Sequence, residues 1–158
     1  MTKDNSAWEN ARSSPISQIE TGETIKGNDW KGLKPAPIGE GTYVDQVTII
    51  LPCYMGQDEL ALTFASLSKQ TYPHDLLEVV VVDDGSEPSI KLPSELPFKA
   101  SVVTQDRDGF GLARARNLGV ERASGEILIF LDCDMVPEPQ LVEAHARWHH
   151  VNRFSLTL

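Results

Sequence analysis

The segment Gly125-Glu-Ile-Leu-Ile-Phe-Leu-Asp-Cys-Asp-Met-Val-Pro137 carries the strongest structural signal in the sequence. Five consecutive apolar residues, 127–131, follow a turn glycine and lead directly into Asp132 and Asp134. An unbroken apolar run of this kind is typical of a strand buried on both faces of a parallel sheet. The stretch therefore predicts a central strand that ends in two carboxylates.

The two aspartates are the first candidate site. In an extended chain, positions i and i+2 point to the same side, so both carboxylates would project into one small volume at the carboxyl edge of the sheet. Ligands of open α/β sheets bind at that edge. Oxygen ligands alone suit Mg²⁺ or Mn²⁺. The alternative is an ordinary loop in which an aspartate caps the next helix.

Working outward, further apolar runs predict strands at 47–52, 77–82 and 101–104. Helical spacing predicts helices at 58–70, with Asp58 as N-cap, at 112–123, and at 137–150. Alternation of this kind indicates an α/β fold with a mostly parallel sheet, right-handed crossovers and helices on both faces. We expect the strand order 3-2-1-4, which places the ligand crevice between the strands that begin at Val47 and Ile127.

The chain divides into three parts by composition. Residues 1–44 are polar, with scattered Gly, Pro and Ser, and we expect an irregular tail that lies along the domain. Residues 45–150 carry the folded domain, and residues 151–158 show no further element.

Composition excludes several classes of protein. The 158 residues carry a formal net charge of −9, which argues against a nucleic-acid partner. The sequence has no apolar run of the roughly 20 residues that span a membrane, and no apolar leader at its start. Its two cysteines form no secreted disulfide framework. These features predict a cytoplasmic protein, either free or peripheral at the membrane.

Three polar clusters follow predicted strands. They are Pro52-Cys53-Tyr54, Asp83-Asp84-Gly85-Ser86 and Asp132-Cys133-Asp134. Each alone is compatible with ordinary turn chemistry. All three, however, meet at the same edge of the predicted sheet, where carboxylates can accept hydrogen bonds from a base or ribose and a tyrosine can stack on a base. The convergence favours a nucleotide site.

Five ordered stretches carry a family resemblance: 47–54, 66–73, 79–86, 111–119 and 131–134. Together they resemble the nucleotide-binding half of a family 2 glycosyltransferase with the Rossmann-like GT-A fold, over residues 47 to about 150. The resemblance implies that Pro52 and Tyr54 surround uracil or another base and that Asp84 accepts a hydrogen bond from it. It also implies that Asp132 lies near the ribose and metal, and that Asp134 ligates the divalent cation, Mn²⁺ or Mg²⁺, on the diphosphate.

The resemblance also places Arg116, in preference to Arg114, beside the nucleotide. The alternative is that both arginines are ordinary surface residues of the helix. The resemblance implies that the family's acidic general base lies beyond Leu158, the last residue of this sequence. We therefore assign no catalytic residue. We therefore expect an incomplete catalytic domain that self-associates, or that needs its second half for transfer.

The function implied is metal-dependent transfer of a sugar, with inversion, from a nucleotide diphosphate sugar to an acceptor hydroxyl. A UDP-sugar is the expected donor, and a glycan, a lipid or another hydroxyl compound is the expected acceptor. One alternative is a nucleotide-sugar-binding module without turnover. Another is a cytidylyltransferase-like domain, for which Cys53-Tyr54-Met55-Gly56 lacks the required phosphate loop with a lysine.

Overall fold

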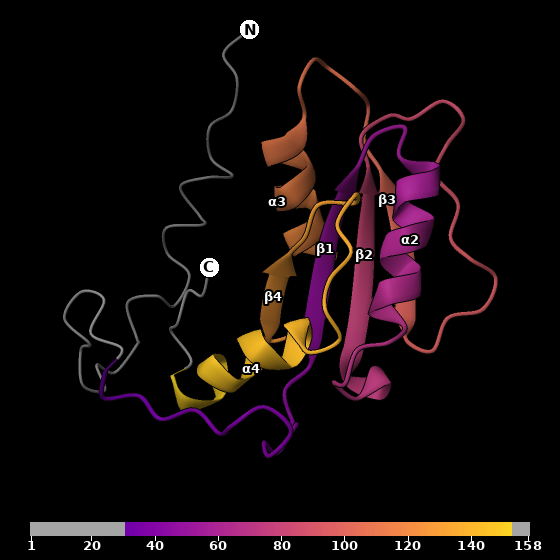
Figure 1. The fold of residues 1–158 in the computed structure, drawn as a ribbon. Coiled ribbons are helices and arrows are strands. Elements are labelled where there is room, and N and C mark those ends of the chain that lie inside the picture. The colour runs from indigo at the N-terminus through magenta and orange to yellow at the C-terminus, as the bar shows by residue number, and fades with distance from the viewer. Residues whose placement is uncertain (1–30, 153–158) are drawn as a thin grey trace, which may run out of the picture. The chain divides into compact units, whose positions relative to one another are not determined.

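A computed structural model describes residues 31–152 of the chain. The predictions for residues 1–30 and 153–158 lie outside the described residues. The strands are β1 (Val47–Cys53), β2 (Leu77–Asp83), β3 (Lys99–Thr104) and β4 (Ile127–Phe130). The α-helices are α2 (Gln57–Leu67), α3 (Leu112–Arg122) and α4 (Leu141–Val151), and a short 3₁₀ turn, η2, spans His74–Leu76. Figure 1 shows how these elements are arranged.

The sheet has the predicted strand order. Its four strands run β3-β2-β1-β4, and every neighbouring pair is parallel. Val47 of β1 pairs with Leu77 on one side and with Ile127 on the other. The prediction that the strands starting at Val47 and Ile127 are neighbours is therefore confirmed.

The core lies on both faces of the sheet because β1 and β2 are buried throughout. Alternate side chains of β1 and β2 pack against α2 and α4 on one face. The intervening residues, among them Ile50 and Val82, pack against Ala115 of α3 on the other face. A Cβ added at Gly119 of α3 would lie 2.3 Å from Cγ2 of Ile50, so only glycine allows this close approach. The α/β fold with helices on both faces is confirmed.

Strand β4 differs from the expectation. We predicted a strand buried on both faces, but Phe130 is 48% exposed and Leu128 is only partly buried. Both point to the side of the sheet on which α3 lies, and α3 packs on β1 and β2 rather than on β4. Strand β4 is also an edge of the described sheet, since it pairs only with β1. The apolar run of β4 is therefore covered on the face that packs against α4 and partly exposed on the other face.

Two helix starts also differ. The N-cap of α2 is Gly56, not Asp58, and no side chain caps the helix. A Cβ at Gly56 would lie 3.2 and 3.3 Å from the sulfurs of Cys133 and Cys53, so the position is tight for any side chain. Helix α4 begins at Leu141 rather than at Pro137, because Pro139 disfavours helical geometry in the residue before it.

Residues 36–45, which we call the N-terminal strap, contain no helix or strand and are held to α4 by a buried carboxylate. Glu143 is 2% exposed and accepts hydrogen bonds from the Gly39 N–H (2.5 Å), the Tyr43 hydroxyl (2.5 Å) and the Thr71 hydroxyl (3.0 Å). Burial by itself would raise the pKa of Glu143, but these donors outweigh it and lower the pKa. A charged Glu143 thus joins the strap, α4 and the segment after α2.

A second buried carboxylate, Glu78 of β2, links β1, β3 and the segment between α3 and β4. It accepts from the hydroxyls of Thr48 (2.6 Å) and Ser124 (2.8 Å) and lies 2.5 Å from the ammonium of Lys99. Burial alone would raise its pKa, but these partners lower the pKa from 4.5 to about 2. The stabilisation is therefore complete above pH 4.5 and is lost as the pH falls towards 2.

We expect Glu78→Gln to lower the free energy of unfolding at pH 7 by about 1–3 kcal/mol, because charged acceptors are replaced by a neutral amide. The difference from the native chain should shrink as the pH falls from 4.5 towards 2, where native Glu78 also becomes neutral. Urea unfolding at pH 7 and at pH 3 measures this. An equal loss at both values would contradict the assignment of a charged Glu78.

Candidate functional site

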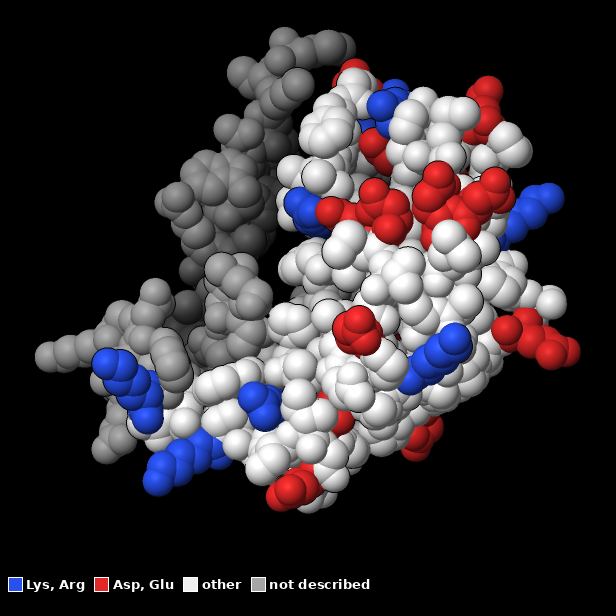
Figure 2. All heavy atoms as spheres, in the orientation of Figure 1, with Lys and Arg blue, Asp and Glu red and all other residues white. Residues whose placement is uncertain are grey.

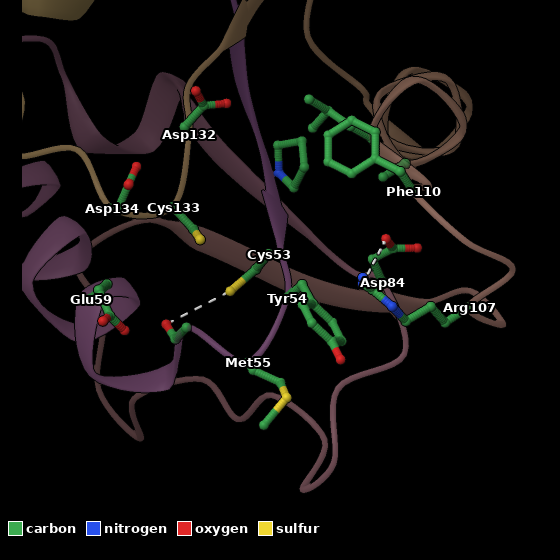
Figure 3. Close-up of a pocket in the computed structure, with 14 residues that line it drawn as sticks. Cys53, Tyr54, Met55, Glu59, Asp84, Arg107, Phe110, Asp132, Cys133 and Asp134 are labelled. Carbon is green, nitrogen blue, oxygen red and sulfur yellow. Dashed lines mark hydrogen bonds and ion pairs between the residues drawn. The ribbon is translucent and has the colours of Figure 1, made fainter.

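A cavity of about 440 Å³ opens at the carboxyl end of the sheet. Its walls come from the loops after β1, β2 and β4 and from the segment before α3 (Figure 3). Its volume lies in the range of small-molecule sites. Five of the residues that we predicted from the sequence line it: Pro52, Tyr54, Asp84, Asp132 and Asp134. The sixth predicted residue, Arg116, does not line the cavity. It forms an ion pair with Asp132, which does line it.

Asp84 is a buried acceptor in the wall of this cavity. It is 7% exposed, and its Oδ1 accepts a hydrogen bond of 2.5 Å from Nε2 of Gln105. Its Oδ2 lies 3.3 Å from Nη1 of Arg107. A Cβ added at Gly111 would lie 2.3 Å from Oδ1, so the backbone before α3 also closes on this carboxylate. The orientation of Asp84 is therefore fixed by neighbours on three sides.

Tyr54 and Arg107 form the outer part of the same wall. The guanidinium carbon of Arg107 lies 3.4 Å from the centre of the Tyr54 ring, and Figure 3 shows Tyr54, Arg107 and Asp84 side by side. Neither Arg107 nor Gln105 was predicted from the sequence. The sequence feature that could have indicated them is their position just after the strand β3, at the edge of the sheet where the three polar clusters meet. A charged, planar group stacked on an aromatic ring beside a carboxylate suits recognition of a flat, polar ligand such as a base.

The neighbouring Asp83 has a different task. It is fully buried and accepts hydrogen bonds from the backbone N–H groups of Ser86 (2.8 Å) and Ile90 (3.2 Å). The Ser86 hydroxyl in turn accepts from the Met55 N–H at 2.8 Å. Adjacent residues of a strand point to opposite sides, so Asp83 holds the loop while Asp84 faces the cavity.

Asp132 and Asp134 lie on a turn, not on an extended strand as we expected. The N–H of Met135 donates to the carbonyl of Asp132 at 3.2 Å and closes the turn, since β4 has already ended at Phe130. We call residues 132–135 the aspartate turn. Both aspartates are exposed and line the cavity, and Asp132 pairs with Nη2 of Arg116 at 3.1 Å. Figure 2 shows acidic side chains gathered at this end of the molecule.

The oxygen donors can hold a divalent cation only together with a ligand. Within residues 31–152, no three His, Cys, Asp or Glu side chains are grouped so that they alone could bind a metal. Asp132 and Asp134 nevertheless supply two carboxylates in one cavity. Mg²⁺ is usually bound by one or two carboxylates plus substrate phosphates and water. The residues present fit that type of site.

Two thiols, those of Cys53 and Cys133, line the cavity. Cys53 and Cys133 are both free, and Figure 3 shows their sulfurs facing each other. The hydrogen bond with Cys133, together with burial, raises the pKa of the Cys53 thiol. Cys53 also donates to the carbonyl of Gly56 at 3.7 Å, which ties the start of α2 to the cavity floor.

Comparison with known proteins identifies the family. The sequence model of glycosyl transferase family 2 matches residues 48–158. The chain belongs to glycosyl transferase family 2. A chondroitin synthase of Escherichia coli is 35% identical over 105 residues, which is 65% of this chain and 15% of that protein. A validoxylamine A glucosyltransferase of Streptomyces hygroscopicus subsp. limoneus is 33% identical over 115 residues, which is 70% of this chain and 25% of that protein.

The fold matches that of solved glycosyltransferases of the GT-A type. The mannosyltransferase PcManGT of Pyrobaculum calidifontis, in complex with GDP-Man and Mn²⁺, matches with a TM-score of 0.60 and 26% identity over 75% of this chain and 35% of that one. S. aureus TarS 1–349 with UDP-GlcNAc matches in fold, with a TM-score of 0.56 and 23% identity over 66% of this chain and 31% of that one. The family 2 chain thus spans a third or less of the curated relatives named above.

None of the helices within residues 31–152 has the length and apolar character needed to cross a membrane.

Proposed function

We propose that this family 2 chain binds a nucleotide diphosphate sugar together with Mn²⁺ or Mg²⁺ and takes part in transfer of the sugar, with inversion, to an acceptor hydroxyl. The observation that carries the proposal is the meeting of Asp84, Tyr54, Asp132 and Asp134 in one cavity at the carboxyl end of the sheet. We assign this role to residues 45–150. The cytoplasmic location stays a prediction.

The base would bind at the Asp84 end of the cavity. Asp84 is an acceptor held by Gln105 and by the close approach of Gly111, so it can receive an N–H of the base without first being oriented. Tyr54 offers a flat surface to the ring, and a base that stacks on the face covered by Arg107 displaces the guanidinium. Buried Pro52 closes the cavity beneath. UDP and GDP are the first ligands to test, because the related structures are complexes with UDP-GlcNAc and GDP-Man.

The diphosphate would bind at the aspartate turn. Asp134, which has no ion pair among the described contacts, would ligate the cation directly, and Asp132 would lie near the ribose and the cation. Arg116 lies 3.1 Å from Asp132 and holds that carboxylate at the cavity rim. When bound, the cation neutralises the charge that develops on the leaving diphosphate. We assign no general base for the acceptor among the described residues.

A binding module without turnover is the second candidate, since the same cavity would serve both functions. Calorimetry of the chain with UDP and GDP, with and without Mn²⁺, tests binding. We expect binding that depends on the metal, and its absence with both nucleotides would overturn the proposal. A parallel assay with labelled nucleotide sugars and mixed acceptors separates the two functions, because metal-dependent binding without any glycoside product would support the binding module.

A further inference from the structure

Thr63, which the sequence analysis did not single out, lies against the aspartate turn from the side of α2. It is fully buried, and its hydroxyl oxygen lies 2.8 Å from the carbonyl oxygen of Cys133 and 2.7 Å from that of Met135. These two carbonyls flank Asp134 in the chain. The hydroxyl on α2 thus contacts the backbone on both sides of Asp134.

The geometry of the turn explains why this contact matters. The bond from the Met135 N–H to the Asp132 carbonyl makes Cys133 and Asp134 the two central residues of the turn. The peptide between two central residues is the one whose rotation distinguishes the common turn types. Its oxygen is the Cys133 carbonyl, one of the two carbonyls of the aspartate turn within hydrogen-bonding distance of the Thr63 hydroxyl. Rotation of that peptide would break the hydrogen bond and re-aim the Asp134 side chain.

Thr63 is also a stiff anchor. A β-branched side chain on a helix has few available χ1 rotamers. The carbonyl of Glu59, one helical turn earlier, lies 3.2 Å from the same hydroxyl and is its local alternative partner. The hydroxyl has one hydrogen to donate. The carbonyls of Cys133 and Met135 lie closer to it than the Glu59 carbonyl does, so the turn supplies the favoured acceptor.

We propose that Thr63 is a positioning residue for Asp134: its hydroxyl fixes the Cys133–Asp134 peptide and thereby holds the Asp134 carboxylate ready for the metal of a bound nucleoside diphosphate. The proposal rests on the proposed function, in which Asp134 ligates the cation. It adds a group that touches neither metal nor nucleotide but sets the affinity for both. Outer-shell partners of metal ligands typically change metal affinity by roughly 10–100-fold when they are removed.

The test compares Mn²⁺ binding by three variants in the presence of saturating UDP, measured from the electron paramagnetic resonance signal of free Mn²⁺. Thr63→Val keeps the shape but removes the hydroxyl, and we expect its Mn²⁺ affinity to fall by roughly 10–100-fold. Thr63→Ser keeps the hydroxyl and should stay within about threefold of the native chain. Thr71→Val removes an exposed threonine hydroxyl bonded to Pro139 and Glu143, outside the cavity wall; it is the control and should leave the affinity unchanged.

Thr63→Ala is measured alongside, because a valine methyl between two carbonyls can destabilise the chain, and near-ultraviolet circular dichroism verifies folding of each variant. Native-like Mn²⁺ affinity in a folded Thr63→Val or Thr63→Ala chain would overturn the proposal, as would a loss that Thr63→Ser fails to rescue. If both hydroxyl-free variants unfold while Thr63→Ser stays native-like, the hydroxyl is a fold determinant and the positioning role is rejected. Failure of the native chain to bind Mn²⁺ with UDP would instead count against the proposed function.

Discussion

Replacement of Asp134 by alanine is expected to abolish Mn²⁺-dependent binding of UDP or GDP. Asp134 faces the cavity and has no ion pair among the contacts described for residues 31–152, whereas Asp132 is already paired with Arg116. Since a cation on a nucleoside diphosphate takes only one or two protein carboxylates, removal of one of two is a large loss. We expect at least a 100-fold drop in metal-dependent affinity, equivalent to about 2.7 kcal/mol. Calorimetric titration with and without Mn²⁺ measures it.

The matched control is Asp58→Ala. Asp58 is also an exposed aspartate near this end of the molecule, in the first turn of α2, but it does not line the cavity. The control removes the same charge from the same region, so general electrostatic attraction of cations is weakened equally. A parallel loss in both variants would mean that overall negative charge, and not ligation, accounts for the metal effect. Unchanged affinity in Asp134→Ala would remove this residue from the site.

The second large effect is expected from a single methyl group at Gly111. The backbone of Gly111 is already compatible with alanine, since its φ is −93°. The added Cβ, however, would lie 2.3 Å from Oδ1 of Asp84 and 2.7 Å from Nε2 of Gln105. Asp84 and Gln105 must therefore separate. We expect nucleotide affinity to fall by roughly 10–100-fold, because hydrogen bonds to charged groups contribute about 1.5–3 kcal/mol.

Gly41→Ala serves as the control for Gly111→Ala, because its Cβ would meet its nearest neighbour at 3.6 Å, an ordinary contact. Titration with UDP and GDP measures the affinity, and thermal unfolding shows whether the fold survives. Native-like affinity in a folded Gly111→Ala chain would show that the orientation of Asp84 does not matter for binding. It would then place the base elsewhere in the cavity.

The sheet was predictable because its signals are local. Unbroken apolar runs such as 77–82 mark strands, and glycines and prolines mark their ends. The cavity residues Tyr54, Asp84, Asp132 and Asp134 were predictable for a related reason, since each lies within four residues of the end of a strand and parallel strands end at one edge. The approximate place of the site thus follows from strand ends alone.

The partners of these residues were not predictable in the same way. Gln105 and Asp84 are 21 positions apart and Thr63 and Cys133 are 70 apart, so no local pattern links either pair. Thr63 looks like one polar residue on a helix, and only the packing of α2 beside the aspartate turn shows its contacts. The exposure of Phe130 was missed because an apolar run indicates burial but does not show which helix covers each face.

The attachment of the N-terminal strap to Glu143 affects how this protein can be shortened. The sequence model of the family starts at residue 48, after both strap donors, Gly39 and Tyr43. A recombinant chain cut at that family boundary would retain a buried glutamate with only the Thr71 hydroxyl among its three described donors. The cut would remove two hydrogen bonds to a charged group and would uncover the side of α4 on which the strap lies, so we expect a less stable domain. Expression of the domain for crystallisation or binding work should therefore begin before Ala36, whose carbonyl accepts a hydrogen bond from Arg147.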